Sequence, residues 1–270
     1  MAKTQRYLAS GPHDLLNSCD VLLKLEDGTE LPAHSQVLAR CMPVFSGMVD
    51  GGPLLQASPS NVVSVPFGDC SSEEAGRFLS AVYSFRAHEH IDEHSALSIA
   101  RLSHKYGVED LVKLCDDALA EKAGIYSKGE SLPIYLKNLE MDVEGFLYTM
   151  KCATLYGMPK LLACCEYYIA LSSSGLQPTT NAVALRVRCL SEPLLRRSSS
   201  RIAEGFCIAF QGLAEHASRR QPCKCACCLG RNDPGYTSCN CHIAATPKEK
   251  LSGFLPGPKA FLKMAGAEKY

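Results

Sequence analysis

The residue types best suited to chemistry gather in a cysteine-rich stretch near the end of the chain, residues 223–242. Four candidate metal ligands form two pairs, each separated by two residues, with ten residues between the pairs: Cys225, Cys228, Cys239 and His242. Three thiolates and one imidazole at this spacing can complete the tetrahedron of a structural zinc site. Three further cysteines in the stretch offer other ligand sets. We therefore interpret it either as a zinc knuckle or as a redox-exposed tail without metal.

A second stretch, "HEHIDEH" at residues 88–94, also carries side chains that bind metals. Its histidines could chelate a metal ion, and the alternative is a solvated polar loop between two helices. Elsewhere the sequence has no Ser-His-Asp order, no glycine-rich phosphate loop and no carboxylate pair with local geometry for acid–base chemistry. We predict that the protein is not an enzyme.

Overall charge gives no general attraction to nucleic acid, because 28 lysines and arginines balance 28 aspartates and glutamates. Arg219, Arg220 and Lys224 could contact phosphate beside the cysteines, or could form the solvated end of a helix. The serines of "RRSSSR", residues 196–201, could be phosphorylated or could cap a helix. We do not expect nucleic acid as a partner.

The 270 residues suffice for a sizeable core in one or two domains. No window reaches the roughly 18 to 20 apolar residues of a membrane span, and the first residues lack the apolar run of a secretory signal. We expect no membrane association and a location in the cytoplasm or the nucleus. In such a reducing compartment, the cysteines outside the cluster are interpreted as small buried side chains.

The elements that would position these residues begin with "DVLLKLEDGTELPAH". Val21, Leu23 and Leu25 alternate on one face, and Asp27-Gly28 is a favourable turn dipeptide. This pattern predicts a β-hairpin with one buried face.

Two helices are expected after the hairpin. Ser35 is predicted to cap the first, and Pro43 is predicted to start the second, which would carry Val44 and Phe45 inward. The β-branched run "VVSVPF" predicts a third strand. After it, Ser71-x-x-Glu74 has the pattern of a capping box that opens another helix.

The next stretch, residues 97–121, predicts a helix hairpin that bends near Gly107. A similar sequence pattern recurs fifty residues later, where Tyr156-Gly157 matches Tyr106-Gly107. The similarity predicts two stacked helix hairpins, either as a true repeat or by convergence on a generic hairpin. One or two more helices are expected before residue 219, because apolar residues recur at helical spacing there.

Several short motifs follow one another in the first part of the chain: Asp20-Val21, Ala33-His34, Leu38-Ala39, Pro43-Val44-Phe45, Tyr83, His104-Lys105-Tyr106 and Leu114-Cys115. In this order they resemble a BTB (POZ) domain covering residues 14–121. The resemblance implies an α+β fold, in which a small mixed sheet is flanked by helical hairpins. In that fold the imidazole of His34 is expected to donate to an otherwise unpaired buried backbone group.

The resemblance extends further along the chain. Residues 122–218 resemble the all-helical three-box or BACK-like extension of adaptor-type members. The amino-acid sequence is similar to that of the speckle-type MATH-BTB adaptors and their plant and algal relatives. Residues 219–270 are expected to form an irregular, cysteine-rich and loosely ordered tail.

The resemblance implies a homodimer formed through the first strand and helix. Six residues are expected at the interface: Leu15, Leu16, Asp20, Val21, Leu23 and Ser35. Asp20 matches an aspartate that many members place in a charged interface pocket. Ser35 stands where those members usually have lysine or arginine, so the pocket lacks its basic partner.

The resemblance also implies binding to the N-terminal helices of cullin three, with Leu54, Gln56 and Tyr83 as contact residues. Many cullin binders carry a hydrophobic-x-glutamate motif in this loop. Here Leu54 keeps the apolar anchor, whereas Gln56 replaces the carboxylate with an amide. Loss of one charged rim contact costs about 1 to 2 kcal/mol.

We therefore expect a protein–protein interaction module that acts as a dimeric substrate adaptor of a cullin-three ubiquitin ligase, with an unidentified protein substrate. The alternative is a BTB scaffold or transcription-related protein that dimerises without a cullin. A zinc-dependent nucleic-acid binder is a third class, and it would need metal in residues 222–242 and a steep salt dependence of oligonucleotide binding.

Overall fold

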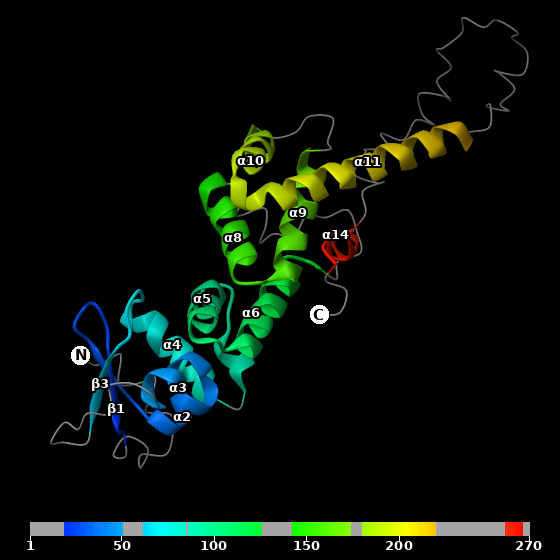
Figure 1. Ribbon diagram of the computed structural model, residues 1–270. Coiled ribbons are helices and arrows are strands. Elements are labelled where there is room, and N and C mark those ends of the chain that lie inside the picture. The colour runs from blue at the N-terminus through cyan, green and yellow to red at the C-terminus, as the bar shows by residue number, and fades with distance from the viewer. Residues whose placement is uncertain are drawn as a thin grey trace, which may run out of the picture. The chain divides into compact units, whose positions relative to one another are not determined.

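The computed structural model of the chain describes the following residues: 19–50, 62–84, 86–125, 142–173, 180–219 and 257–266. They fall into two compact units (Figure 1). Of the described residues, the first unit comprises those up to Lys122 together with Thr149–Leu162, and the second comprises those between Ala123 and Tyr148 and those from Ala163 onward.

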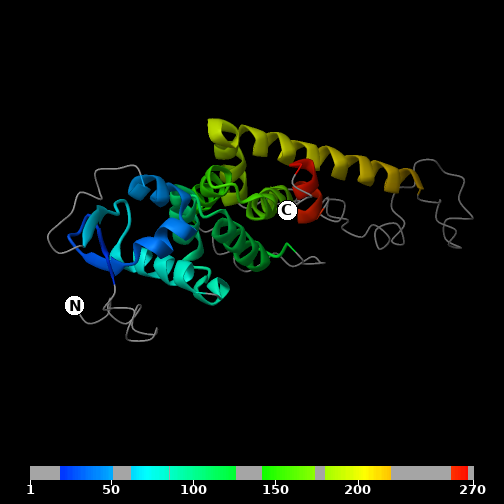
Figure 2. The same ribbon diagram turned by 60° about the horizontal axis from the view of Figure 1, so that its bottom comes forward.

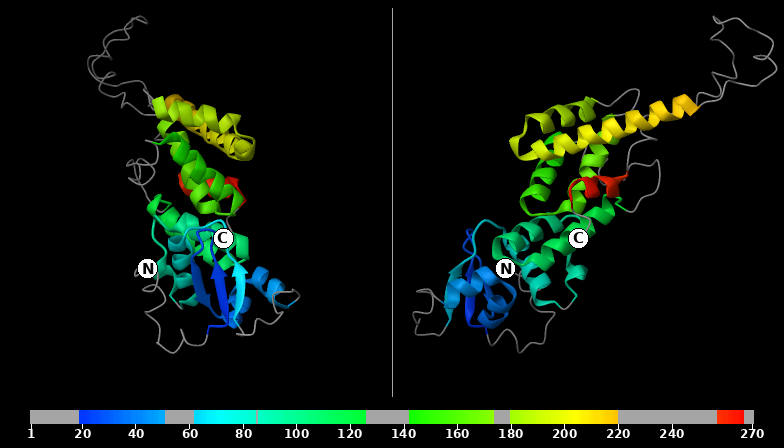
Figure 3. Two further views of the ribbon diagram at one scale, coloured as in Figure 1. Left: turned by 90° about the vertical axis from the view of Figure 1, so that its left-hand side faces the viewer. Right: turned by 45° about the vertical axis from the view of Figure 1, so that its right-hand side comes forward.

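The first unit is built on a three-stranded mixed sheet. Strand β1 (Val21–Lys24) pairs antiparallel with β2 (Glu30–Ala33) and parallel with β3 (Val63–Pro66), which gives the order β2-β1-β3 (Figure 3, left). The predicted hairpin is confirmed, because Gly28 turns the chain at φ 81° and the N–H of Thr29 donates to the carboxylate of Asp27 at 2.8 Å.

One face of this sheet forms the core of the unit. Alternate side chains of the hairpin are buried: Val21, Leu23, Leu31 and Ala33. Just beyond β3, the ring of Phe67 stacks on that of Tyr106 with 4.7 Å between the ring centroids, and Phe78 lies 6.2 Å from Phe67. Three buried aromatic rings thus join the sheet to the helices that carry Phe78 and Tyr106.

The helices of this unit follow in chain order: α2 (Ser35–Cys41), α3 (Pro43–Asp50), α4 (Ser72–Tyr83), the short 3-10 helix η3 (Ala87–His90), α5 (Ala96–Tyr106) and α6 (Glu109–Lys122). The capping box of Ser71 and Glu74 is present at the start of α4, as predicted. The predicted cap at Ser35 is wrong by one residue, because His34 is the N-cap of α2 and Ser35 is its first helical residue.

The two predicted helix hairpins are both present. The second consists of α8 (Val143–Leu155) and α9 (Pro159–Ser173). In each hairpin a left-handed glycine, Gly107 or Gly157, ends the first helix. The N–H of Val108 donates to Ser103 at 2.8 Å, and that of Met158 donates to Ala153 at the same distance. Both turns therefore use the same Schellman type of helix ending.

A carboxylate on α6 caps the start of α9 within the first unit. Asp116 is buried and accepts the N–H of Leu161 at 2.8 Å and that of Lys160 at 3.1 Å. Burial raises the pKa of Asp116 to about 6, although the two backbone donors act to lower it. The neighbouring Asp117 forms an exposed ion pair with the side chain of Lys160.

The second unit continues with four more elements: α10 (Thr180–Ser191), the 3-10 helix η4 (Pro193–Leu195), α11 (Arg196–Arg219) and α14 (Pro258–Met264). Helix α14 lies beside α11 (Figure 2) and inserts the buried ring of Phe261 at Gly205. A Cβ atom at Gly205 would lie 2.5 Å from Cζ of Phe261. Glycine is therefore required for this contact.

A buried ion pair joins α9 to α11 in the second unit. Glu166 has no exposed side-chain area, and Arg201 reaches both of its carboxylate oxygens, with Nε at 2.8 Å from Oε2. Burial raises the pKa of Glu166, and the guanidinium of Arg201 opposes that rise. Such a bidentate pair fixes both position and angle of the two helices.

The architecture confirms the expected α+β class, in which a small mixed sheet with helical hairpins is followed by further helices. The prediction that α3 carries Val44 inward is wrong, since this side chain is 42% exposed, whereas Phe45 is buried as predicted. No helix in the described ranges is long and apolar enough to cross a membrane. The boundaries predicted at residues 121 and 218 stay predictions.

Replacing Gly107 or Gly157 by alanine should lower the free energy of unfolding by about 1 to 2 kcal/mol, because only their left-handed backbone disfavours a side chain. Both have φ near 70°, and the nearest atom to a new Cβ is 3.6 Å away at Gly107 and beyond 4 Å at Gly157. Gly47→Ala, inside α3 with open space around it, is the matched control and should be neutral or stabilising. Urea denaturation of the three variants measures these changes, and equal effects at all three sites would contradict the prediction.

Asp116→Asn should remove a pH-dependent component of stability. The folded protein keeps the proton on Asp116 up to about pH 6, whereas the unfolded chain loses it near pH 4. Stability from this group therefore falls as the pH rises between those values. The asparagine amide does not ionise, although its single oxygen can accept only one of the two N–H groups that the two carboxylate oxygens accept. The free energy of unfolding of the variant should therefore rise by about 1 to 3 kcal/mol relative to that of the wild type between about pH 4 and about pH 7. A difference that stays constant across this range in urea titrations would refute the prediction.

Candidate functional site

Four residues singled out in the sequence meet where β1, β2, α2 and α4 come together, and we call this cluster the strand–helix junction: Asp20, His34, Ser35 and Tyr83. Asp20, just before β1, accepts the N–H of Ser35 on Oδ1 at 2.7 Å and the hydroxyl of Ser35 on Oδ2 at 2.5 Å. The carboxylate thereby provides the acceptor that the first turn of α2 needs, while His34 supplies no capping side chain.

The other half of the strand–helix junction is a contact between His34 and Tyr83. The hydroxyl of Tyr83, on the last residue of α4, accepts the backbone N–H of His34 at 2.8 Å and lies 3.2 Å from Nδ1 of its imidazole. The imidazole of His34 was expected to donate to a buried backbone group, whereas its ring contacts the side-chain hydroxyl of Tyr83. The tyrosine hydroxyl is engaged inside the unit.

Electrostatics at the junction favour one fixed protonation state. Partial burial acts to raise the pKa of Asp20, but the side-chain and backbone hydrogen bonds from Ser35 outweigh it, so this pKa lies below its usual value. Burial raises the pKa of Tyr83. At neutral pH the carboxylate is therefore ionised and the phenol is neutral, and neither is poised to exchange protons. The geometry suits a structural anchor better than acid–base chemistry.

The remaining predicted interface residues divide into two groups. Val21 and Leu23 are 2% and 0% exposed, so their side chains are used in the core of their own unit. On the outer face of the sheet, Leu22 of β1 lies opposite Pro32 of β2, and both are partly exposed. Leu15 and Leu16 lie outside the described residues.

Other predictions also fall outside the described part of the chain. These are the cullin-contact residues Leu54 and Gln56, and the four candidate zinc ligands Cys225, Cys228, Cys239 and His242. Across the described ranges, no group of three or more histidine, cysteine, aspartate or glutamate side chains could hold a metal ion.

The histidine-rich stretch at residues 88–94 is a polar surface segment in the structure. His88, His90 and His94 are all exposed. Asp92 accepts the hydroxyl of Ser95 at 2.8 Å and its N–H at the same distance, so it organises the turn that leads into α5. The arrangement agrees with the solvated-loop interpretation.

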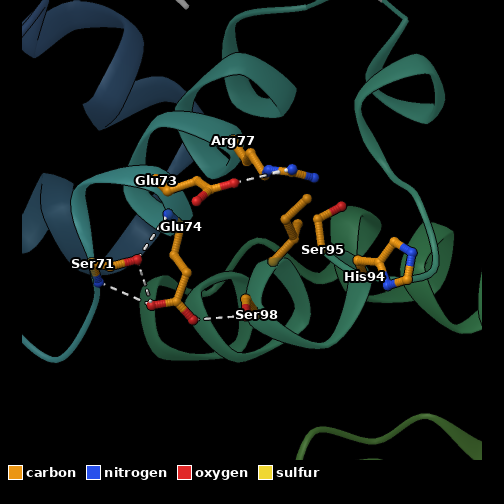
Figure 4. A pocket seen from close by; sticks show the side chains of 8 residues that line it. Ser71, Glu73, Glu74, Arg77, His94, Ser95 and Ser98 are labelled. Atoms are coloured by element: carbon orange, nitrogen blue, oxygen red, sulfur yellow. Dashed lines mark hydrogen bonds and ion pairs between the residues drawn. The ribbon is translucent and has the colours of Figure 1, made fainter. Parts of the chain in front are cut away.

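A cavity of about 170 Å³ lies beside α4 and the start of α5, and most of the residues that line it carry polar groups (Figure 4). Glu74 accepts the hydroxyl of Ser98 at 2.7 Å as well as the N–H of Ser71, and Arg77 bridges Glu73 and Asp92. Arg77 thus pairs within α4 and with the segment before α5, and Glu74 reaches α5 itself through Ser98 and through Arg101 at 3.3 Å. The cavity wall is therefore a link between α4 and α5.

The sequence did not indicate one surface feature of the first unit. Val44 of α3 is exposed beside the turn between α5 and α6, where its Cγ2 would lie 3.6 Å from a Cβ at Gly107. At the same end of α5, the ring of His104 lies 5.5 Å from the ring of Tyr156, which follows the exposed Leu155. Apolar surface from α3 and from the α8–α9 turn thus flanks the end of α5. In the sequence, the one indication of this exposed surface is that Val44 and the buried Phe45 are neighbours and must point in different directions.

Asp20→Ala should lower the free energy of unfolding by about 1 to 2 kcal/mol, because it removes both acceptors of the α2 start. Since the pKa of Asp20 is lowered by folding, this loss should be full at neutral pH and should shrink as the pH falls through the pKa of the folded state. Ser35→Ala, which keeps the backbone bond, is the matched variant and should lose less. Urea denaturation at several pH values checks both, and equal losses for the two variants would contradict the capping role.

Comparison with known proteins agrees with this arrangement. A family model described as BTB/POZ domain matches residues 13–123. BTB/POZ domain-containing protein 9 of Homo sapiens is 23% identical over 189 residues, which is 70% of this chain and 28% of that protein. A BTB/POZ domain-containing protein of Arabidopsis thaliana is 26% identical over 151 residues, covering 56% of this chain and 38% of that protein.

A third relative, TD and POZ domain-containing protein 5 of Mus musculus, is 25% identical over 169 residues, covering 62% of this chain and 42% of that protein. The chain thus spans less than half the length of these curated relatives. The mixed sheet, the order of the helices and the family model agree on the same part of the chain. Residues 13–123 are a BTB/POZ domain, a module through which proteins bind other proteins.

Proposed function

We propose that this protein is a homodimeric substrate adaptor, which binds cullin three through its BTB domain and presents another protein for ubiquitin transfer. BTB domains generally mediate dimerisation and partner binding, and proteins that carry them are typically not enzymes. Beyond this general role, we propose that the chain forms a homodimer, that its partner is cullin three, and that it resembles the speckle-type adaptors. The rival is a dimeric scaffold or transcription-related protein without a cullin.

For the dimer, the support comes from the strand–helix junction and the outer face of the sheet. Because Ser35 satisfies the carboxylate of Asp20 within the protomer, this site needs no lysine or arginine to neutralise it. Leu22 and Pro32 offer apolar contact area beside it. We place the two-fold interface there, together with Leu15 and Leu16.

For the cullin, the observation that carries the proposal is the exposed Val44 at the end of α5. An apolar side chain that is 42% exposed next to a fixed turn can serve as an anchor for a partner helix. Leu155 and Tyr156 add apolar surface at the same end. Together with Leu54 and Gln56, these residues form the contact surface that we propose for cullin three.

Light scattering on a size-exclusion column tests both parts of the proposal. The chain alone should elute as a dimer, and addition of the cullin-three N-terminal region should give a two-plus-two complex. Val44→Glu should weaken that complex by about tenfold or more while leaving the dimer intact, because it places a charge in the anchor position.

Val187→Glu, on an exposed side chain of α10, is the matched control and should not change cullin binding. A folded dimer that ignores the cullin at micromolar concentration would refute the adaptor and leave the scaffold as the better account. A monomer would refute the homodimer.

A further inference from the structure

Helix α10 of the second unit carries a row of apolar side chains on its outer face, which we call the α10 stripe: Val183, Val187, Leu190 and, in η4, Leu194. Their exposed fractions are 46%, 55%, 62% and 38%. The spacing of four and three residues keeps Val183, Val187 and Leu190 on one face of α10. These three follow the helix axis over about two turns, and Leu194 comes after the extended Glu192, which separates α10 from η4.

The opposite face of α10 already has its partner. Leu185 and Cys189 are 0% and 1% exposed, and the hydroxyl of Ser199 on α11 lies 3.6 Å from Sγ of Cys189. Helix α11 runs alongside α10 (Figure 3, right). Since the inner face is buried by these residues, the stripe is not needed to hold α10 in place. Three large apolar side chains in one exposed row, followed by a fourth on the next element, are a feature of interaction surfaces.

The surroundings of the stripe are basic. Residues 180–200 contain four arginines and one glutamate, although the chain as a whole is neutral. The next arginine, Arg201, is paired with the buried Glu166 and does not belong to this surface. Arg186 lies on one flank of α10 and stacks on the ring of Phe206, and Arg188 lies on the other flank, paired with Glu144 at 2.6 Å. Arg196 and Arg197, next to Leu194, are exposed.

Arg196 and Arg197 occupy the first turn of α11, where the helix dipole is positive and cations are unfavourable. Within the described part of the chain, neither guanidinium has a carboxylate partner. At this position the two arginines lower the stability of α11, and no ion pair within the described residues compensates for that loss. It creates a concentrated positive field at the end of the α10 stripe.

A small cavity lies along the stripe. It measures about 30 Å³, opens between α10 and α11, and is bordered by Arg186, Leu190 and Ile202. This is room for about one methyl-sized group. An apolar side chain of a bound partner could be anchored there while the rest of its face covers the stripe.

We propose that the α10 stripe binds an amphipathic helix of another protein, in which an apolar row is flanked by glutamate or aspartate. The apolar row covers Val183, Val187 and Leu190, and the acidic flanks pair with the arginines around them. A second copy of α10 is a poorer occupant, because it would bring two sets of arginines to one interface. The site does not depend on cullin binding by the first unit.

Fluorescence anisotropy with the full chain tests this site. The probe is a labelled helix-forming peptide of about four turns, with leucines at positions i, i+4, i+7 and i+11 and glutamates on both flanks. A matched peptide carries lysines in place of the glutamates. The acidic peptide should bind, its affinity should fall with salt, and the basic peptide should bind about tenfold or more weakly.

Two variants locate the binding. Val187→Glu should weaken the acidic peptide by about tenfold, and Arg196→Glu combined with Arg197→Glu should do the same without touching the apolar row. Val44→Glu in the first unit should leave binding unchanged. Equal binding of both peptides, or full binding by both stripe variants, would overturn the proposal. Self-association that Val187→Glu abolishes would also overturn it, in favour of a second copy as the occupant.

Discussion

The unpaired backbone N–H groups at helix starts are the constraint on which much of this structure depends. Such a group costs about 1 to 3 kcal/mol if it is buried without an acceptor. Side-chain oxygens accept these N–H groups at three helix starts: Asp20 at α2, Ser71 of the capping box with Glu74 at α4, and Asp116 at α9. Asp20 reaches α2 from just before β1, and Asp116 reaches α9 from α6, so each also fixes a contact between elements that are separated in the sequence.

Local signals made the elements of the first unit predictable. The alternation of Val21 and Leu23 placed the buried face of the hairpin correctly, and the capping box of Ser71 and Glu74 marked the start of α4. The Tyr-Gly pair gave both helix hairpins, because a left-handed glycine after a helix is visible in the sequence. Each of these signals spans only a few residues.

Interactions between distant residues were not predictable in the same way. The sequence predicts Ser35 as the cap because its own hydroxyl can accept a backbone N–H, but the acceptor in the structure is Asp20, 15 residues earlier. Asp116 and Leu161 are 45 residues apart. At the candidate site, Asp20, Ser35 and Tyr83 come together as neighbours, whereas Val21 and Leu23 are buried by the same alternation that identified the strand. The exposure of Val44 depends on which elements pack around α3, and a local sequence pattern does not predict those neighbours.

The buried pair of Glu166 and Arg201 has a consequence for how the second unit assembles. Sliding α11 along α9 by one helical turn, about 5.4 Å, would separate the two charges and leave a carboxylate without compensation in an apolar interior. Apolar contacts alone would tolerate such a slip, since one leucine can replace another. The ion pair therefore acts as a register mark, which admits a single alignment of the two helices. It also sets where Arg196 and Arg197, one turn earlier on α11, emerge at the surface.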